Sequence, residues 1–309
     1  MIAQHQAAGG AGVIATAKQA ARRLLGIDPQ SDVTPLARLE WVGSRTHGYY
    51  VPDGLLEPGS VCYAVGAGED ISFDTEVAER HGCRVVVIDP TPEGRAHFRL
   101  VQQRIAAGEP LSTTNGEPFR YRIAPERLGL LKFLQIGVWD RAATMRFYEP
   151  TRADYPSHSV AMFQESGRYL ELPVDRLSRL MGSQGHDRID LLKLEIEGAE
   201  YRVLETIVED RLDVRAILVE YDEVWHCEGK GRAHLFRIRD STRRLLRAGY
   251  RLAHSTPMFK RLFVRDDVFQ VLKHRARRLE REAPCPHRPT SAPATAAGRT
   301  APGSGDGGA

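Results

Sequence analysis

Between about residues 55 and 275, short hydrophobic runs alternate with longer segments in which hydrophobic positions recur every three or four residues. The first run, at 60–68, precedes a segment with helical spacing at 71–82, which Gly82 can end. The next run, at 83–90, is almost purely β-branched, as expected for a strand that is buried on both faces. This alternation is typical of a parallel sheet flanked by helices.

The same alternation continues along the rest of this segment. Further strands are expected at 131–139, 188–198, 215–222, 250–256 and 260–267, with a short hairpin arm at 144–150. Further helices are expected at 91–108, 199–211 and 234–249. Strand–helix steps that close in an antiparallel pair predict an α/β fold. We expect a doubly wound, mostly parallel, seven-stranded sheet with an antiparallel edge strand, of the Rossmann-like kind.

The two ends of the chain differ from this central domain, which we place at 55–275. Residues 1–54 are predicted to be an N-terminal helical extension, since they begin with an amphipathic pattern that ends at Gly26. Residues 276–309 are predicted to be a disordered tail, because 283–309 consist largely of Pro, Ala, Gly and Ser with almost nothing to bury.

Composition narrows the class of protein. The 309 residues carry a net charge of +3, and the densest basic run, at 273–282, is interrupted by glutamates, which is typical of a solvated helix end rather than a nucleic-acid surface. The four cysteines are widely spaced, which disfavours a zinc site or a disulfide framework. No apolar stretch approaches the roughly 20 residues of a membrane span, and no signal peptide is evident. We expect a cytoplasmic protein.

A glycine turn follows the first predicted strand. Gly66 and Gly68 lack a Cβ atom and therefore allow the backbone to approach a ligand closely. Asp89 ends the next predicted strand, where a carboxylate can accept hydrogen bonds from both hydroxyls of a ribose. Because ligands of open α/β sheets bind beyond the carboxyl ends of the strands, we expect a nucleoside here. The alternative is an ordinary tight turn, with Asp89 only capping a helix.

The residues around this turn favour a nucleoside without phosphates. A dinucleotide fingerprint has a third glycine that lets the helix approach a pyrophosphate, and Ile71 stands at that position. Glu69 and Asp70 would repel a pyrophosphate but attract a cation. We therefore predict that the ligand is S-adenosylmethionine, which combines an adenosine with a sulfonium cation.

The third predicted strand ends beside the expected position of the base. Val138 and Trp139 can form an apolar wall for adenine, with Asp140 as a polar contact, although Trp139 could equally belong to the core. The predicted cofactor-binding residues are Gly66, Ala67, Gly68, Glu69, Asp70, Asp89, Val138 and Trp139.

Charged residues alternate along the fourth predicted strand. Lys193, Glu195 and Glu197 would point to one face and the hydrophobic residues between them to the other. Because buried unpaired ions are costly, this face should be paired or should face a cleft. A second polar group follows the fifth strand, with Glu220, Asp222, Glu223 and His226. The alternative is a Lys193–Glu220 salt bridge with exposed loop acids.

Taken together, these segments resemble the FkbM family of S-adenosylmethionine-dependent methyltransferases. The resemblance covers about 58–265, and its most specific block reads LLKLEIEGAE. Glu195 stands where the family more often has Asp, and Tyr63 replaces the usual leading acid of the glycine turn. The resemblance implies a methyltransferase fold, and methyl transfer to a hydroxyl of a small molecule, a sugar or a natural product.

For such a reaction we assign roles to five residues. Glu195 or Glu197 orients the acceptor, while Lys193 fixes these acids and stabilises the developing oxyanion. His226 is the candidate general base, with Glu220 behind it.

Three alternatives stay open. Glu195, Glu197 and Asp222 could gather Mg²⁺, a cation that prefers oxygen ligands, although the sequence does not favour this over a metal-free base. The same sheet could serve a nicotinamide-dependent oxidoreductase, or a binding module that has no catalytic activity. The expected partner is a small-molecule or glycan acceptor, with neither nucleic acid nor membrane involved.

Overall fold

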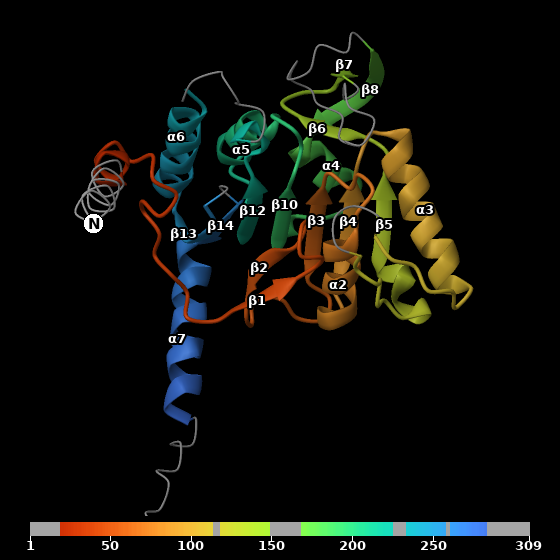
Figure 1. Ribbon diagram of the computed structural model, residues 1–309, viewed down its shortest axis with the longest axis horizontal. Coiled ribbons are helices and arrows are strands. Elements are labelled where there is room, and N and C mark those ends of the chain that lie inside the picture. The colour runs from red at the N-terminus through yellow and green to blue at the C-terminus, as the bar shows by residue number, and fades with distance from the viewer. Residues whose placement is uncertain (1–18, 114–117, 149–167, 225–232, 258–259, 283–309) are drawn as a thin grey trace, which may run out of the picture.

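The computed structural model describes residues 19–113, 118–148, 168–224, 233–257 and 260–282 (Figure 1). Its central sheet has seven strands. Across the sheet they are β5 (Leu131–Leu134), β4 (Arg84–Ile88), β3 (Val61–Val65), β10 (Leu191–Leu194), β12 (Ala216–Glu220), β14 (Lys260–Arg265) and β13 (Tyr250–Ser255). The strands from β5 to β12 pair in parallel, and β14 pairs antiparallel with both its neighbours. The predicted doubly wound α/β fold is confirmed, with the reversed strand one place in from the edge.

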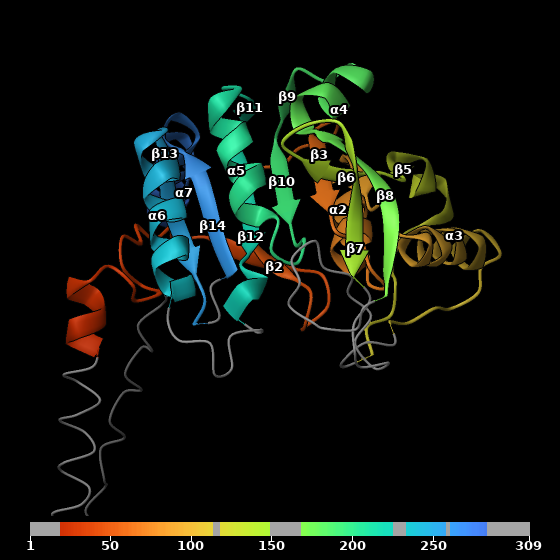
Figure 2. The ribbon, with the colours of Figure 1, turned by 90° about the horizontal axis from the view of Figure 1, so that it is seen from above.

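Helices cover both faces of this sheet. They are α2 (Ser72–His81), α3 (Pro92–Ala106), α4 (Leu177–Ser183), α5 (Glu200–Glu209), α6 (Ala233–Arg247), α7 (Asp266–Glu282), and the 3₁₀ turns η1 (Pro125–Leu130) and η2 (Asp222–Val224). Figure 2 shows α5 and α6 side by side. Alternate residues of β4 enter two separate cores: Val85 and Val87 pack in the cluster with α2, α3 and α7, and Val86 packs with α4, α5 and α6. A strand buried on both faces explains the β-branched run that predicted it.

Residues 39–52 form a hairpin, so the prediction that 1–54 are a helical extension is wrong for this part. Strands β1 (Leu39–Val42) and β2 (Tyr49–Pro52) pair antiparallel. Val42, Tyr49 and Val51 are buried in the core that also contains α2 and α7, which makes the hairpin part of the domain. Residues 19–24 are helical, and residues 1–18 lie outside the described part.

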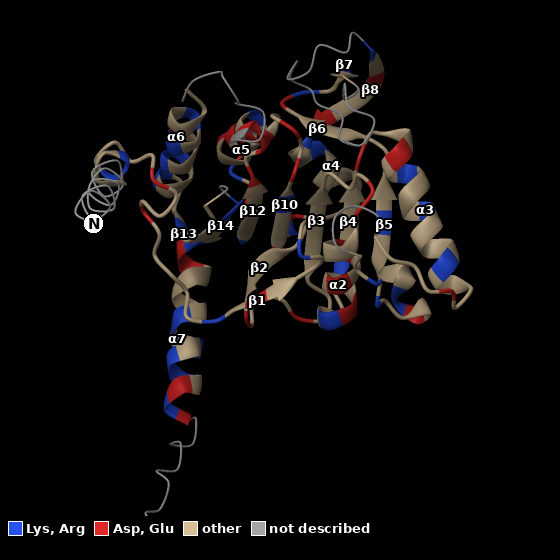
Figure 3. Ribbon diagram, in the orientation of Figure 1, with Lys and Arg blue, Asp and Glu red and all other residues tan. Residues whose placement is uncertain are grey.

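At the other end, α7 continues to Glu282, past the predicted domain boundary at 275. Basic and acidic residues both occur along its last turns (Figure 3), and most of residues 273–282 are exposed, as expected for a solvated helix end. The predicted disordered segment 283–309 lies outside the described residues. Among the described helices, none has the length and apolar character needed to cross a bilayer.

Two predicted strands are each interrupted. The third leaves the central sheet after Leu134, and β6 (Gly137–Trp139) instead pairs with β8 (Tyr169–Arg176), which also pairs with β7 (Ala143–Tyr148). This second sheet lies beyond the carboxyl ends of β3 and β4 (Figure 1). The fourth is split into β9 (Arg188–Ile189), which pairs with β11 (Asp213–Val214), and β10. Because β10 ends at Leu194, the charged pattern continues past the strand into a turn.

Candidate active site

A pocket opens where the strand order reverses, between the carboxyl ends of β3, β4 and β10. It contains about 890 Å³ of empty space, including the part open to solvent. Its lining comes from the turn after β3, the end of β4, the second sheet and the turn after β10. In open α/β sheets this position is where ligands bind, as the sequence predicted.

The glycine turn after β3 forms one wall of the pocket. Gly66 has φ +90°, and a Cβ atom there would overlap the carbonyl oxygen of Glu195. Gly68 has φ +48°, and no atom lies within 4 Å of the place where its Cβ would be. Glycine is therefore needed at Gly66 for close packing, whereas Gly68 leaves backbone open toward the pocket.

Asp89 holds this turn in place. Its Oδ2 accepts hydrogen bonds from the amides of Ala67 at 2.9 Å and Gly68 at 3.0 Å. Its Oδ1 accepts from the amide and the hydroxyl of Thr91, at 2.8 and 2.5 Å. Asp89 lines the pocket and is 5% exposed. It is thus located where a ribose contact was predicted, and it also orders the turn; the ribose contact stays a prediction.

The two acids of the turn both line the pocket but differ in their partners. Asp70 accepts a hydrogen bond from the Ser44 hydroxyl at 2.9 Å and from the Ser72 amide at 2.7 Å. Within the described residues, Glu69 makes neither a hydrogen bond nor an ion pair. Because Asp70 occupies an amide at the start of α2, the site that a pyrophosphate would use already holds a carboxylate.

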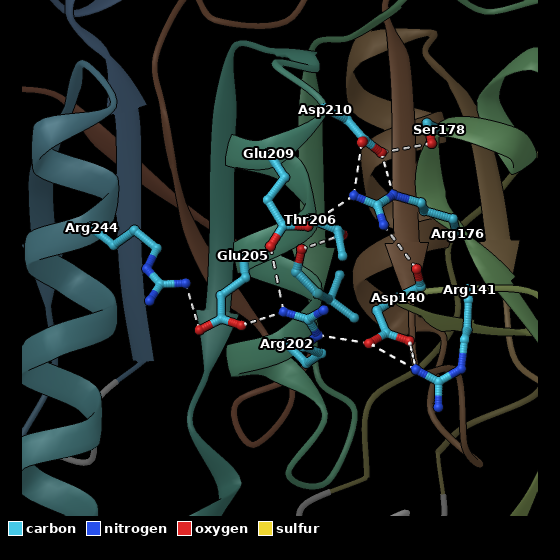
Figure 4. A network of polar contacts seen from close by, with 11 residues as sticks. Asp140, Arg141, Arg176, Ser178, Arg202, Glu205, Thr206, Glu209, Asp210 and Arg244 are labelled. Carbon is cyan, nitrogen blue, oxygen red and sulfur yellow. Dashed lines mark hydrogen bonds and ion pairs between the residues drawn. The ribbon is translucent and has the colours of Figure 1, made fainter.

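The second sheet supplies an apolar wall, with two differences from the prediction. Val138 and Phe147 line the pocket, whereas Trp139 does not, because successive residues of a strand point to opposite sides. Asp140 is also turned away from the pocket. Its carboxylate pairs with Arg202 at 2.7 Å and Arg141 at 3.2 Å (Figure 4).

Lys193 and Glu195 form a buried ion pair in the floor of the pocket. Their Nζ and Oε2 atoms are 2.9 Å apart, and Lys193 is 1% exposed. Burial alone would lower the pKa of Lys193, but the charges of Glu195 and Asp74 raise it above the ordinary value. Burial likewise opposes ionisation of Glu195, yet Lys193 holds its pKa well below the usual range. The alternative pairing of Lys193 with Glu220 is wrong, because Glu220 pairs with Lys260 at 2.9 Å.

Two residues of the β1–β2 hairpin complete this floor, and the sequence reasoning missed both. The Tyr49 hydroxyl donates to Glu195 at 3.2 Å and to Glu220 at 3.4 Å. Nδ1 of His47 lies 3.2 Å from the other oxygen of Glu195, and His47 lines the pocket. A signal was present, since the segment LEWVGSRTHGYYVP places two short strand-like runs around two glycines.

Glu197 lies in a turn and not on the strand face that was predicted for it. It lines the pocket, and its φ of +50° is left-handed, which is uncommon for a residue other than glycine. Its amide donates to Asp222 at 3.0 Å, while Glu200 accepts from the amides of Ile196 at 3.2 Å and Gly198 at 3.0 Å. Two buried carboxyl groups therefore fix this strained turn.

Burial makes these two carboxyl groups harder to ionise. Burial raises the pKa of Glu200 to about 7, and burial together with the charges of Glu197 and Glu200 raises the pKa of Asp222. The suggested Mg²⁺ set of Glu195, Glu197 and Asp222 is not assembled. In the described part of the chain, no three His, Cys, Asp or Glu side chains come together as a metal site.

Two further predicted residues remain. Glu220 is 5% exposed and lies behind Tyr49, so it does not reach the pocket lining. His226, the predicted base, lies outside the described residues. The described partners of Glu220 include Tyr49 and Lys260.

With this geometry in place, comparison with known proteins decides the family. Residues 62–252, more than half of the chain, match the family model described as the methyltransferase FkbM domain. The protein belongs to the FkbM methyltransferase family. The predicted resemblance is thereby confirmed, and this FkbM methyltransferase has His47 and Tyr49 outside the matched segment.

No curated protein matches the chain significantly. Among solved structures, a fibrillarin pre-rRNA processing protein of Methanococcus jannaschii is similar, with 7% identity over 75% of this chain and 85% of that chain. The TM-score is 0.35, which supports no functional inference for this FkbM methyltransferase.

Proposed function

We propose that this FkbM methyltransferase moves a methyl group from S-adenosylmethionine to a hydroxyl of a small molecule, a sugar or a natural product. The charge of the pocket carries the proposal. Five carboxyl groups line it: Glu69, Asp70, Asp89, Glu195 and Glu197. The basic side chains in the described lining are Lys193 and His47, and Glu195 contacts both. Such a lining favours a cationic ligand over a pyrophosphate.

The lining also fits the parts of the cofactor. Asp89 and the open backbone at Gly68 would hold the ribose, and Glu69 has a carboxylate available for the ammonium or the sulfonium. Ile88, Val138 and Phe147 would contact the adenine. When bound, S-adenosylmethionine supplies an electrophilic methyl group; the residues of the chain bind, orient and deprotonate the acceptor.

The acceptor side of the pocket contains the groups that such a reaction needs. Glu197 is held at the lining by its constrained turn, and we assign it to orienting the acceptor. Fixing two reactants in position can contribute up to roughly 7–11 kcal/mol of a barrier, and proton removal by a general base about 10²–10⁴-fold in rate. In the floor of the pocket, the ion pair with Lys193 keeps Glu195 ionised.

Isothermal titration calorimetry with S-adenosylmethionine, S-adenosylhomocysteine and NAD⁺ separates the candidate cofactors. We expect binding of the first two and none of NAD⁺, because Ile71 and Asp70 occupy the positions that a pyrophosphate would need. Binding of NAD⁺ without S-adenosylmethionine would establish the oxidoreductase alternative instead.

Radiolabelled S-adenosylmethionine and a cell extract test catalysis and reveal the acceptor. We expect a labelled small molecule or glycan, and activity that survives EDTA. Glu197→Gln should abolish transfer while leaving cofactor binding near normal. Binding of the cofactor with no labelled product in any extract would instead indicate a module without catalytic activity.

A further inference from the structure

His47 reaches the pocket from outside the segment that defines the family. It lies between β1 and β2, in a loop that Ser44 connects to the glycine turn by hydrogen bonds. The Ser44 hydroxyl donates to Asp70 at 2.9 Å and accepts from the His47 amide at 3.0 Å. The Ser44 amide donates to the Ser72 hydroxyl at 2.8 Å. The position of His47 is therefore tied to the glycine turn by a continuous set of hydrogen bonds.

The imidazole is oriented from the other side by Glu195. Nδ1 lies 3.2 Å from Oε1 of Glu195, whose other oxygen contacts Lys193 at 2.9 Å and Tyr49 at 3.2 Å. A carboxylate held in this way keeps the proton of a neutral imidazole on Nδ1, and leaves a lone pair on Nε2. Because the His47 side chain is 31% exposed and lines the pocket, the ring is accessible to a bound acceptor.

Three carboxyl groups of the same lining, those of Glu195, Asp70 and Asp89, are poorer candidates for a base. Glu195 is saturated by Lys193, Tyr49 and His47, and the Lys193 charge keeps its pKa well below the usual range. Asp70 and Asp89 accept hydrogen bonds that order the glycine turn. A group whose pKa lies near neutrality is better matched to proton removal than a fully ionised acid.

We infer that His47 is the general base of this methyltransferase and that Glu195 is its positioning residue; this inference rests on the proposed function. As the acceptor oxygen gains the methyl group, the electron pair of the broken S–C bond stays with sulfur. The hydroxyl proton passes to Nε2 of His47, giving an imidazolium next to the Glu195 carboxylate. S-adenosylhomocysteine and the methyl ether leave, and the proton is then lost to solvent.

The surroundings of His47 set the pH at which it works. Burial lowers its pKa, the hydrogen bond and charge of Glu195 raise it, Asp70 raises it further and Lys193 lowers it, with a net increase above 6.5. His47 must be neutral to accept a proton. Transfer should therefore be lost on the acid side of this raised pKa and increase as the pH rises through it.

The experiment uses the full chain with histidines labelled with ¹³C, as wild type, His47→Gln, Glu195→Gln and His81→Gln. His81 is the control, because its Nε2 also lies close to a glutamate, 3.3 Å from Oε1 of Glu40, but it does not line the pocket. NMR titration gives the pKa of His47, whose signal is identified because it is absent from the spectrum of His47→Gln. Calorimetry with S-adenosylhomocysteine checks cofactor binding, and rates of label transfer are measured from pH 5 to 9 on the acceptor found in extract.

We expect His47→Gln to bind S-adenosylhomocysteine normally but to transfer label about 10²–10⁴-fold more slowly. Its pH profile should also lack the acid limb, that is, the fall in rate at low pH. Glu195→Gln should lower the pKa of His47 in the NMR titration and move the acid limb to lower pH, and His81→Gln should match wild type.

Wild-type rates and an unchanged pH profile in His47→Gln would overturn the inference while leaving the proposed function intact. Absence of any transfer by wild type would overturn the proposed function instead, and an unchanged His47 pKa in Glu195→Gln would separately overturn the pairing.

Discussion

Two charge networks of similar composition lie on different parts of this protein. One, below the pocket, consists of Lys193, Glu195, Tyr49, Glu220 and Lys260, and its charged side chains are 1–17% exposed. The other joins α5 to its neighbours on the surface (Figure 4). Its central members are Arg202, Glu205, Glu209, Arg176 and Asp210, with side chains 23–45% exposed.

The difference lies in what each network controls. Below the pocket, water does not screen the charges, so each group sets the ionisation of the next and loss of one partner leaves another charge uncompensated. On the surface, solvent screens each pair, and the network chiefly ties the second sheet to α5 through Arg202 and Asp140. Similar side chains therefore set one another's ionisation in one region and dock a sheet in the other.

The largest effect is expected from Lys193→Met, which leaves Glu195 buried without its cation. We expect a loss of about 3–5 kcal/mol in the free energy of unfolding, measured with urea. Lys193→Met combined with Glu195→Leu should recover part of this loss, because no unpaired charge then remains. A single variant that loses less than about 1 kcal/mol would show that the pair is effectively solvated.

Tyr49→Phe should have the next largest effect. It removes a hydroxyl that donates to two carboxylates, which we expect to reduce the free energy of unfolding by about 1–3 kcal/mol. The neighbouring Tyr50 is 36% exposed and provides the control. Tyr50→Phe should stay within about 0.5 kcal/mol of wild type. Equal effects of the two variants would contradict a special role for the buried hydroxyl.

Glu200 gives the buried region a pH dependence near neutrality. Its pKa is raised from 4.5 to about 7 on folding, mainly by burial, so its stabilising contribution is complete below the unfolded value and is lost as the pH rises through the folded one. Between pH 6 and 8, wild type should lose on the order of 1 kcal/mol more than Glu200→Gln, as thermal and urea unfolding at each pH would measure. Parallel pH profiles would mean that Glu200 is ionised throughout.

The smallest effect is expected from Arg202→Gln, although Arg202 contacts three acids: Asp140 at 2.7 Å, Glu205 at 2.8 Å and Glu209 at 3.4 Å. We expect a loss below about 1 kcal/mol that shrinks further in 1 M NaCl, where the screening length is about 3 Å. Urea unfolding at low and high salt measures it. A loss as large as that of Lys193→Met, and insensitive to salt, would remove the distinction between the two networks.

The local part of this architecture could be predicted from the sequence. The buried strands follow from β-branched runs, and the glycine turn from Gly66 and Gly68, because these features depend on residues close together in the chain. The mostly parallel pairing of the seven-stranded sheet follows from the alternation of strands and helices along the chain. Lys193, Glu195 and Glu197, which stand out in the sequence, all line the pocket, while their roles there stay predictions.

What could not be predicted depends on contacts between distant residues. His47 and Glu195 are 148 positions apart, and no periodicity in the chain connects them. The strands of the hairpin have four residues each, too few to outweigh the helical pattern that precedes them. Glu197 was assigned to the strand because alternation continues past Leu194, but the backbone turns left-handed there. Trp139 ends an apolar run that reads as one strand of the central sheet, but this end of the run is β6, which pairs with β8 in the second sheet.

The contact at Gly66 limits how this protein can be redesigned. Nothing larger than hydrogen fits between that residue and the backbone after β10, so the glycine turn, where we propose that the cofactor binds, packs directly against the turn that carries Glu195 and Glu197. Under the proposed function, a substitution that moves the turn after β10 to admit a bulkier acceptor would therefore displace the glycine turn and the cofactor as well.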